Sequence, residues 1–331
     1  MIHKPRKMPL LLLQLQALSR RILYDHPKLP IITSDLNKAK AGYKGEKSID
    51  YILSFLDSNK YHIFHDIRLQ TADKFFQIDT LILTRKFLLA IEVKNIAGTL
   101  YFDPIFHQLI RRKDGEEIAF PDPLIQISRH ENLLRQWLKE KHLPQIPIFP
   151  FVVISNPQTI IRTTAENRSL NQKVLHRDYL LTRIEQIQSN HRPVREKDLN
   201  VCIQTILSET TESNSPILNR YNLSSNELIK GVICPYCQRP PMTRKHSTWI
   251  CPHCHQTEKS AHITALNDYF LLINQTAKNK HICDYFQTYR PSLVKRFFHT
   301  LNYNYSGRNK GRVYQMKYIE EREDNKIFNN T

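Results

Sequence analysis

The sequence contains no apolar run long enough to cross a membrane, no internal repeat and no extended low-complexity segment. A membrane-spanning helix needs about 20 consecutive apolar residues, so we expect no membrane contact. The first 21 residues combine a basic start with a leucine run, but glutamines interrupt the run and no small-residue cleavage site follows. Apolar residues recur there at helical spacing, so residues 1–35 are predicted to form an arm with an amphipathic docking helix.

Acidic residues and cysteines are also scarce. The chain has 31 Asp and Glu against 48 Lys and Arg, a formal net charge of +17, which favours a polyanionic partner such as nucleic acid. Four of the six cysteines lie in two CxxC pairs, a pattern that favours metal binding in a reducing, cytoplasmic compartment over a disulfide framework. The 331 residues, 40% of them hydrophobic, are typical of two or three globular domains.

Alternating helix and strand signals predict an α/β domain over residues 36–207. Its expected strands are 62–69, 75–84, 87–95, 99–102 and the continuous apolar run 148–155. Its expected helices are 44–58, 176–189, 196–208 and one that starts at Pro123 with Asp122 as its N-cap. A polar, turn-rich linker is expected at 208–231. It is followed by three predicted segments: a zinc ribbon at 232–257, a basic domain at 258–318 and a disordered tail at 319–331.

The stretch FFQIDTLILTRKFLLAIEVKN reads as a buried hairpin that nevertheless carries charges. Side chains alternate along a strand, so Glu92 and Lys94 share one face. Folding the hairpin around its central Arg-Lys pair sets Asp79 opposite Glu92, with β-carbons about 5 Å apart. Facing carboxylates repel unless a divalent cation lies between them. Arg-Lys is not a favoured two-residue turn, so a register shift of one step remains open.

A third carboxylate fits the same arrangement. Glu46 shares a helical face with Ile49 and Leu53 and is therefore expected to point toward the sheet. Two or three carboxylates can hold Mg²⁺ or Mn²⁺ with water still on the metal, which activates that water against phosphate. Lys94 would orient the water or neutralise charge on the phosphate. These charges predict a metal-dependent phosphodiesterase site.

Three segments, GEKSIDYIL, FQIDTLILTRKFLLAIEVKNIAGTL and DPLIQ, carry a family resemblance. Over roughly residues 40–155 the sequence resembles the nuclease-related domain family, a branch of the PD-(D/E)xK nuclease superfamily. The resemblance implies a restriction-endonuclease-like mixed sheet flanked by helices. The superfamily's leading Pro-Asp is replaced here by Ile78-Asp79. His130, one helical turn after Gln126, is interpreted as an ordinary surface or core histidine and is not included among the predicted site residues. The active-site positions that the family implies are Glu46, Asp79, Glu92, Lys94 and Gln126.

The two CxxC pairs are separated by 13 residues and resemble a zinc ribbon; they are Cys234, Cys237, Cys251 and Cys254. Four thiolates can surround Zn²⁺ tetrahedrally at about 2.3 Å, and a domain this small depends on the metal to fold. A four-cysteine site has no open coordination position, so the predicted zinc is structural. His253 and His255 are the alternative ligands.

The C-terminal segment 281–318 has seven Lys or Arg against one acid. Two short helices followed by a glycine-tipped hairpin resemble a winged helix-turn-helix. The basic side chains expected to lie along phosphate are Lys295, Arg296, Arg308, Lys310 and Arg312.

The sequence thus favours a Mg²⁺- or Mn²⁺-dependent DNA nuclease that its C-terminal modules deliver to the substrate. Two alternatives remain at this point. One is a non-catalytic DNA-binding regulator that uses the nuclease fold as a scaffold, and the other is a nuclease acting on RNA.

Overall fold

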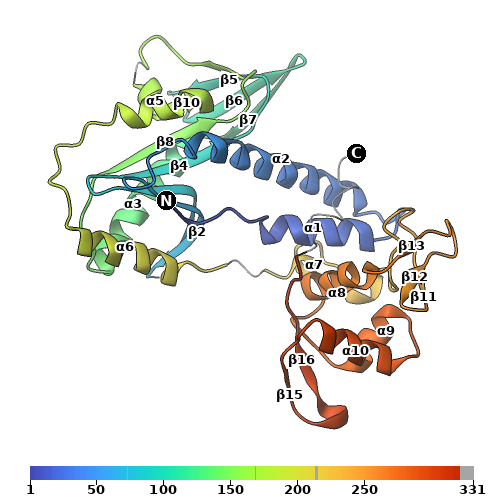
Figure 1. The fold of residues 1–331 in the computed structure, drawn as a ribbon. Coiled ribbons are helices and arrows are strands. Elements are labelled where there is room, and N and C mark those ends of the chain that lie inside the picture. The colour runs from blue at the N-terminus through green and yellow to red at the C-terminus, as the bar shows by residue number, and fades with distance from the viewer. Residues whose placement is uncertain (73, 168, 213–214, 321–331) are drawn as a thin grey trace. The chain divides into compact units, whose positions relative to one another are not determined.

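The computed structural model describes residues 1–72, 74–167, 169–212 and 215–320. The chain folds as two compact units, coloured along the chain in Figure 1. Unit 1 contains residues 1–8 and 40–213, and unit 2 contains residues 9–39 and 214–331. The chain therefore passes between the units three times, and the second passage lies inside helix α2 (Leu29–Leu53).

Unit 1 is built on a six-stranded mixed sheet of order β1-β2-β3-β4-β8-β10. Strands β2, β3 and β4 form an antiparallel meander, whereas β1 runs parallel to β2, and β4, β8 and β10 run parallel to one another. This mixed α/β architecture was predicted. The strands are β1 (Ile2–Lys4), β2 (His62–Thr71), β3 (Lys74–Leu83), β4 (Leu88–Lys94), β8 (Ile148–Ile154) and β10 (Val174–His176).

Helices cover both faces of this sheet. On one face, α3 (Pro123–Glu140) and α6 (Glu196–Glu209) contribute Trp137 and Ile203 to a core that includes Ala90. On the other face, α2 and α5 (Leu180–Glu185) pack around Ile91. A short helix α4 (Leu170–Lys173) precedes β10. Alternate residues of β4 therefore serve two different cores, as its continuous apolar sequence predicts.

A second sheet in unit 1 has the order β7-β6-β5-β9. Its strands are β5 (Thr99–Asp103), β6 (Gln108–Lys113), β7 (Glu116–Pro121) and β9 (Ile160–Arg162). Sequence analysis did not predict the β6–β7 hairpin. Asp114 and Gly115 form its turn with φ of 53° and 83°. An Asp-Gly pair is a strong signal for this kind of turn because Gly and Asp tolerate the left-handed backbone, so the signal was present.

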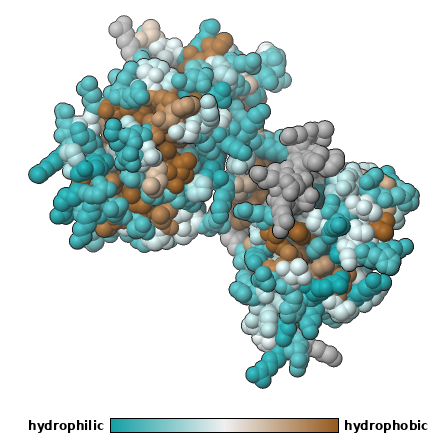
Figure 2. Space-filling view, in the orientation of Figure 1, coloured by the Kyte–Doolittle hydropathy of each residue, from teal (hydrophilic) through white to brown (hydrophobic). Residues whose placement is uncertain are grey.

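Unit 2 combines helices with two small three-stranded sheets, β11-β12-β13 and β14-β16-β15. Its helices are α1 (Leu10–Arg21), α7 (Ile217–Arg220), α8 (Ala261–Leu272), α9 (Asn279–Phe286) and α10 (Pro291–Thr300). Its strands are β11 (Thr243–Lys245), β12 (Thr248–Ile250), β13 (Thr257–Glu258), β14 (Thr276–Ala277), β15 (Tyr305–Ser306) and β16 (Val313–Gln315). In the view of Figure 2, the β15–β16 end of unit 2 is hydrophilic.

The compact units differ from the predicted domains. The expected boundary after residue 35 falls inside α2, because that helix begins at Leu29. The expected zinc ribbon and basic domain share one core, in which Trp249 contacts Phe286 and Phe297. Part of the expected linker is also packed, since apolar side chains such as Leu218 and Leu228 are buried. The expected disordered tail lies outside the described residues from position 321 onward.

The docking helix predicted near the N-terminus is α1, which packs on α8 within unit 2. Asp268 of α8 is fully buried and accepts hydrogen bonds from Arg20 and Arg21 of α1. The apolar residues that recur at helical spacing are buried in four cases, Leu12, Leu15, Leu18 and Ile22, whereas Leu11 is exposed. The hydrogen bonds from Arg20 and Arg21 to the buried Asp268 add a polar contact that apolar spacing does not predict. Within the described parts of the chain, no helix combines the length and apolarity of a membrane span.

Candidate active site

A cavity of about 340 Å³ lies on the α3 side of the main sheet. Asp79 of β3, Glu92 of β4, and Gln126 and His130 of α3 all line it. The hairpin register that brings the two carboxylates together is the predicted one, with Thr80 paired to Ile91. The register shift that the turn left open does not occur.

Hydrogen bonds connect the side chains of this cavity. The Lys94 Nζ donates to Glu92 Oε1 at 2.7 Å and to Gln126 Oε1 at 3.0 Å. Asp79 Oδ2 accepts a hydrogen bond from the backbone N–H of Val93 at 2.8 Å. The structure therefore brings together four of the five predicted site residues, from two strands and one helix.

The strands separate at the position of the carboxylates. The β3–β4 ladder ends at Thr80 and Ile91, and beyond it the Asp79 carboxylate takes the place of a ladder carbonyl. Ile78 and Leu81 lie three residues apart, yet both belong to the core on the α3 side. Strict alternation would put these two side chains on opposite faces of the sheet, so the alternation along β3 is interrupted near Asp79. The resulting opening beside the sheet is the cavity.

Glu46, the fifth predicted residue, approaches from α2. A β-carbon at Gly45 would lie 2.5 Å from the Asn95 Cβ, so only glycine lets α2 pass this close to the end of β4. Glu46 follows directly but does not line the cavity; its Oε2 instead accepts a hydrogen bond from Arg6 at 2.8 Å. Among the described residues, the ligand oxygens of Glu46, Asp79 and Glu92 do not all lie within 4.8 Å of one another.

Arg6 is a residue of this region that sequence analysis missed. Its side chain is only 2% exposed. Besides Glu46 it contacts Asp50 at 3.2 Å, the His65 Nδ1 at 3.0 Å and the Thr80 Oγ1 at 2.9 Å. Burial lowers the pKa of His65 to about 3, so its ring is neutral and accepts from Arg6. The N-terminal arm thus supplies a buried cation beside the candidate site, and no local sequence pattern marks Arg6.

Burial sets the protonation of the carboxyls. It raises the pKa of Glu46 to about 7, although Arg6 acts in the opposite direction. Burial, followed by the nearby Glu92 and Glu46 charges, raises the pKa of Asp79 well above its usual range. Burial therefore favours the protonated forms of Asp79 and Glu46, and a bound cation would displace those protons.

The donor atoms fit two kinds of metal. The carboxylate oxygens of Asp79 and Glu92, in one cavity, are the hard ligands that Mg²⁺ and Mn²⁺ prefer. In unit 2 the sulfurs of the four predicted cysteines all lie within 4.8 Å of one another. The separations Cys234–Cys254 and Cys237–Cys251 are 3.6 and 3.5 Å, close to the edge of about 3.8 Å that a tetrahedral Zn–S length of 2.3 Å requires. The four-cysteine cluster is therefore able to hold Zn²⁺.

His130 was set aside at the sequence level, yet it faces the carboxylates. Its Nδ1 lies 3.8 Å from Glu92 Oε2, is buried, and has no hydrogen-bond partner among the residues that the structure describes. Burial lowers the pKa of His130, so a neutral ring that can accept a proton is favoured. The spacing of four from Gln126 on one helical face was the signal available in the sequence.

The predicted phosphate-binding residues lie in unit 2. Lys295 and Arg296 are exposed on α10, on the side opposite its buried Val294 and Phe297. Arg308 is exposed before β16, whereas Arg312 is half-buried with its Cζ 4.0 Å from the centre of the Tyr305 ring. The side chain of Lys310 lies outside the described ones.

Residues 41–155 match the family model described as nuclease-related domain, which confirms the resemblance predicted for residues 40–155. An uncharacterized protein of Bacillus anthracis is 27% identical over 111 residues, covering 33% of this chain and 52% of that protein. The chain thus spans about half the length of this relative. A crystal structure of a Vibrio cholerae protein aligns over 60% of this chain and 52% of that one, with 15% identity and a TM-score of 0.25.

Proposed function

We propose that this protein is a metal-dependent nuclease that hydrolyses phosphodiester bonds of DNA. One observation carries the proposal: within the nuclease-related segment, Asp79 and Glu92 share a cavity with Gln126, and Lys94 bridges Glu92 and Gln126. A protein that served only as a scaffold would have little use for two facing carboxylates in a cavity, where burial raises the pKa of Asp79.

Each residue has a definite task in this proposal. Asp79 and Glu92 would hold Mg²⁺ or Mn²⁺, and the bound metal would polarise the phosphate and the attacking water. Gln126 accepts from Lys94 and so fixes the direction of its ammonium group. Lys94 then stabilises the negative charge that develops on the phosphate. The neutral His130 is positioned to accept a proton, and Glu46 adds carboxylate charge near Asp79.

The test is incubation of the full chain with plasmid, linear duplex and single-stranded DNA in Mg²⁺ or Mn²⁺. We expect metal-dependent cleavage by the unaltered protein and loss of most cleavage in Glu92→Ala, because one of the two cavity carboxylates is removed. Glu166→Ala, in an exposed loop, is the matched control and should cut normally. Cleavage of RNA alone would favour the RNA-directed alternative. Binding of DNA without any cleavage would favour the non-catalytic regulator.

We further propose that unit 2 delivers the nuclease to DNA through a zinc ribbon and a winged helix-turn-helix. Support comes from the helices α9 and α10 and the β15–β16 hairpin, which occur at the predicted positions. Exposed basic side chains on α10 add a positive surface suited to phosphate. Because the ribbon and the helices share one core, deleting residues 257–331 would disrupt the whole unit. Point substitutions are therefore the cleaner test.

In the double variant Lys295→Ala/Arg296→Ala, DNA affinity should fall and its salt dependence should flatten. Each lost phosphate contact lowers the log–log salt slope by about 0.9 on duplex DNA, so two lost contacts lower it by roughly 1.8. The control is Arg195→Ala/Lys197→Ala in unit 1, which removes two neighbouring basic side chains, one of them paired with Asp198. Salt slopes are measured by fluorescence anisotropy, and equal slopes for the two double variants would refute the delivery role of Lys295 and Arg296.

A further inference from the structure

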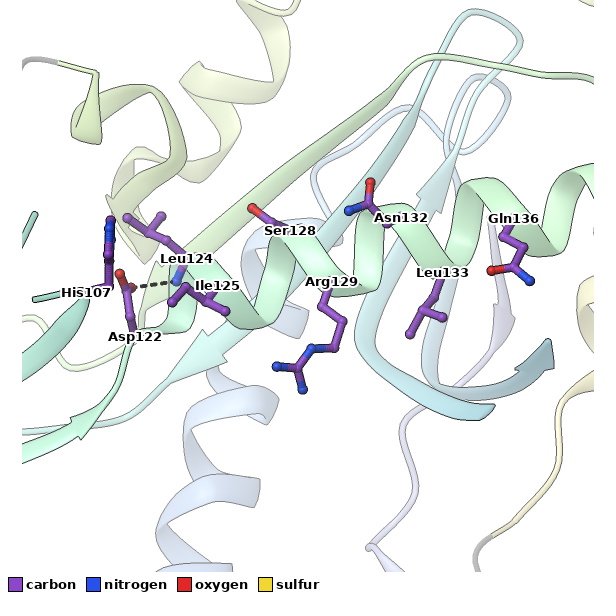
Figure 3. A pocket seen from close by; sticks show the side chains of 9 residues that line it. All are labelled: His107, Asp122, Leu124, Ile125, Ser128, Arg129, Asn132, Leu133 and Gln136. Carbon is purple, nitrogen blue, oxygen red and sulfur yellow. Dashed lines mark hydrogen bonds between the residues drawn. The ribbon is translucent and has the colours of Figure 1, made fainter. Parts of the chain in front are cut away.

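A second, larger cavity of about 530 Å³ runs along the outer face of α3. Figure 3 shows the side chains that line it, which come from successive turns of the helix, with His107 near the N-terminal end. His107 lies in the turn between β5 and β6 of the second sheet of unit 1. We call this cavity the α3 groove; the lining residues used below are Ile125, Ser128, Arg129, Asn132 and Leu133.

The α3 groove is elongated along the helix, and its lining combines polar and apolar side chains. Its lining extends from Leu124 to Gln136, which corresponds to about 18 Å of helix at 1.5 Å per residue. Ser128 and Asn132 are four residues apart and form a polar row, while Ile125 and Leu133 lie in a neighbouring row on either side of Arg129. Polar groups that reach phosphate or sugar, beside apolar groups that pack on bases, are what a nucleic-acid strand requires.

The α3 groove adjoins the cavity of the candidate active site. Arg129 and Leu133 line both the α3 groove and the cavity that contains Asp79 and Glu92. Any strand lying in the groove would therefore pass Arg129 just before it reaches the carboxylates.

Arg129 is exposed and forms no hydrogen bond or ion pair with any residue in the described part of the chain. Arg135 of the same helix, in contrast, is paired with Glu131 at 2.9 Å and lines neither cavity. An unpaired guanidinium at the junction of a groove and an acidic cavity suits a ligand whose phosphate must be held close to carboxylates.

We propose that the α3 groove binds a single strand of nucleic acid and that Arg129 holds the phosphate next to the bond that is cut. At about 3.4 Å per nucleotide, the groove accommodates roughly five stacked nucleotides. Ser128 and Asn132 contact the backbone of that strand, and Leu133 packs against a base or sugar. This inference rests on the proposed nuclease function and extends it to the position of the substrate.

Single-turnover and steady-state cleavage of a 12-nucleotide single-stranded DNA by the full chain test this inference. Arg129→Ala should raise KM about tenfold, because a charge-assisted hydrogen bond is lost, and should leave kcat within about twofold. The salt slope of binding should fall by about 0.7, the value for one phosphate contact on a single strand. Arg129→Lys should keep the slope, and Arg135→Ala should change neither KM nor slope. An RNA of the same sequence, assayed in parallel, shows which sugar the groove accepts.

DNA binding is also measured by fluorescence anisotropy in Ca²⁺, without Mg²⁺ or Mn²⁺. This measurement does not depend on cleavage, so it separates the groove proposal from the nuclease proposal. If Arg129→Ala behaves like Arg135→Ala while the unaltered protein cuts DNA, the groove assignment is overturned and the nuclease function stands. If no nucleic acid is cut but Arg129→Ala still lowers affinity and slope, the groove assignment survives and the nuclease function fails.

Discussion

Lys94→Ala is expected to lower kcat for DNA cleavage by roughly 100- to 1000-fold while DNA affinity stays within about twofold. The difference arises because Lys94 acts where charge develops in the transition state, whereas affinity depends on many cations of a chain with net charge +17. Its Nζ is already held by Glu92 and Gln126 in a direction that leaves one ammonium hydrogen for the substrate.

The measurement pairs a cleavage assay with anisotropy on the same DNA. Lys86→Ala is the matched control, since Lys86 is an exposed lysine at the turn of the same hairpin, remote from the carboxylates along both strands. It should match the unaltered protein in both assays. Normal cleavage by Lys94→Ala would refute the enzymatic proposal, because no other lysine among the described residues is bonded to the cavity carboxylates.

Replacing Cys234 by serine is expected to abolish stoichiometric zinc binding and to unfold most of unit 2. Apparent zinc-binding free energies of about 10–16 kcal/mol in small four-ligand sites equal or exceed the whole stability of a typical domain. Cys234 and Cys251 are fully buried in the core that also contains Leu266 and Phe286. Loss of the metal would therefore destabilise the helices that share this core as well as the ribbon.

Elemental analysis of protein purified without chelator gives the zinc content, and amide hydrogen exchange gives the extent of unfolding. Protection should vanish in α8 to α10 but persist in the strands of unit 1, which has separate cores. Cys283→Ser is the control, because Cys283 lies on α9 outside the cluster and contacts Asn279. Zinc-free unaltered protein, or full zinc content in Cys234→Ser, would rule out the structural metal site.

The placement of Arg6 changes how the boundaries of the nuclease-related segment are understood. The family match begins at residue 41, yet the Arg6 guanidinium contacts Glu46 and Asp50 from a strand-forming arm 40 or more residues earlier. A fragment cut to residues 41–155 would leave Glu46 and Asp50 without their buried cation. Partly buried carboxyls that lose their partner are costly, so a fragment for biochemical work requires residues 1–8 as well as the matched segment.

Features that depend on local rules could be predicted from the sequence. The hairpin register around Asp79 and Glu92 followed from two-residue alternation and a short turn, and strand pairing agrees with it. The cap of α3 followed from Asp122 before Pro123, and the Asp122 carboxylate accepts from the Leu124 N–H at 2.8 Å. The cysteine cluster followed from its spacing. Each of these features is encoded within about 20 neighbouring residues.

Features that join distant segments could be recognised only once the chain was folded. Arg6 meets Thr80 across 74 positions, and Arg21 meets Asp268 across 247, so neither pair has a local signature. The interrupted alternation near Asp79 and the orientation of His130 depend on how β3, β4 and α3 pack together. Periodicity states which residues share a face of one element, but packing between elements determines what that face meets. For this reason the carboxylates were predictable, whereas Arg6, the orientation of His130 toward Glu92 and the α3 groove were not.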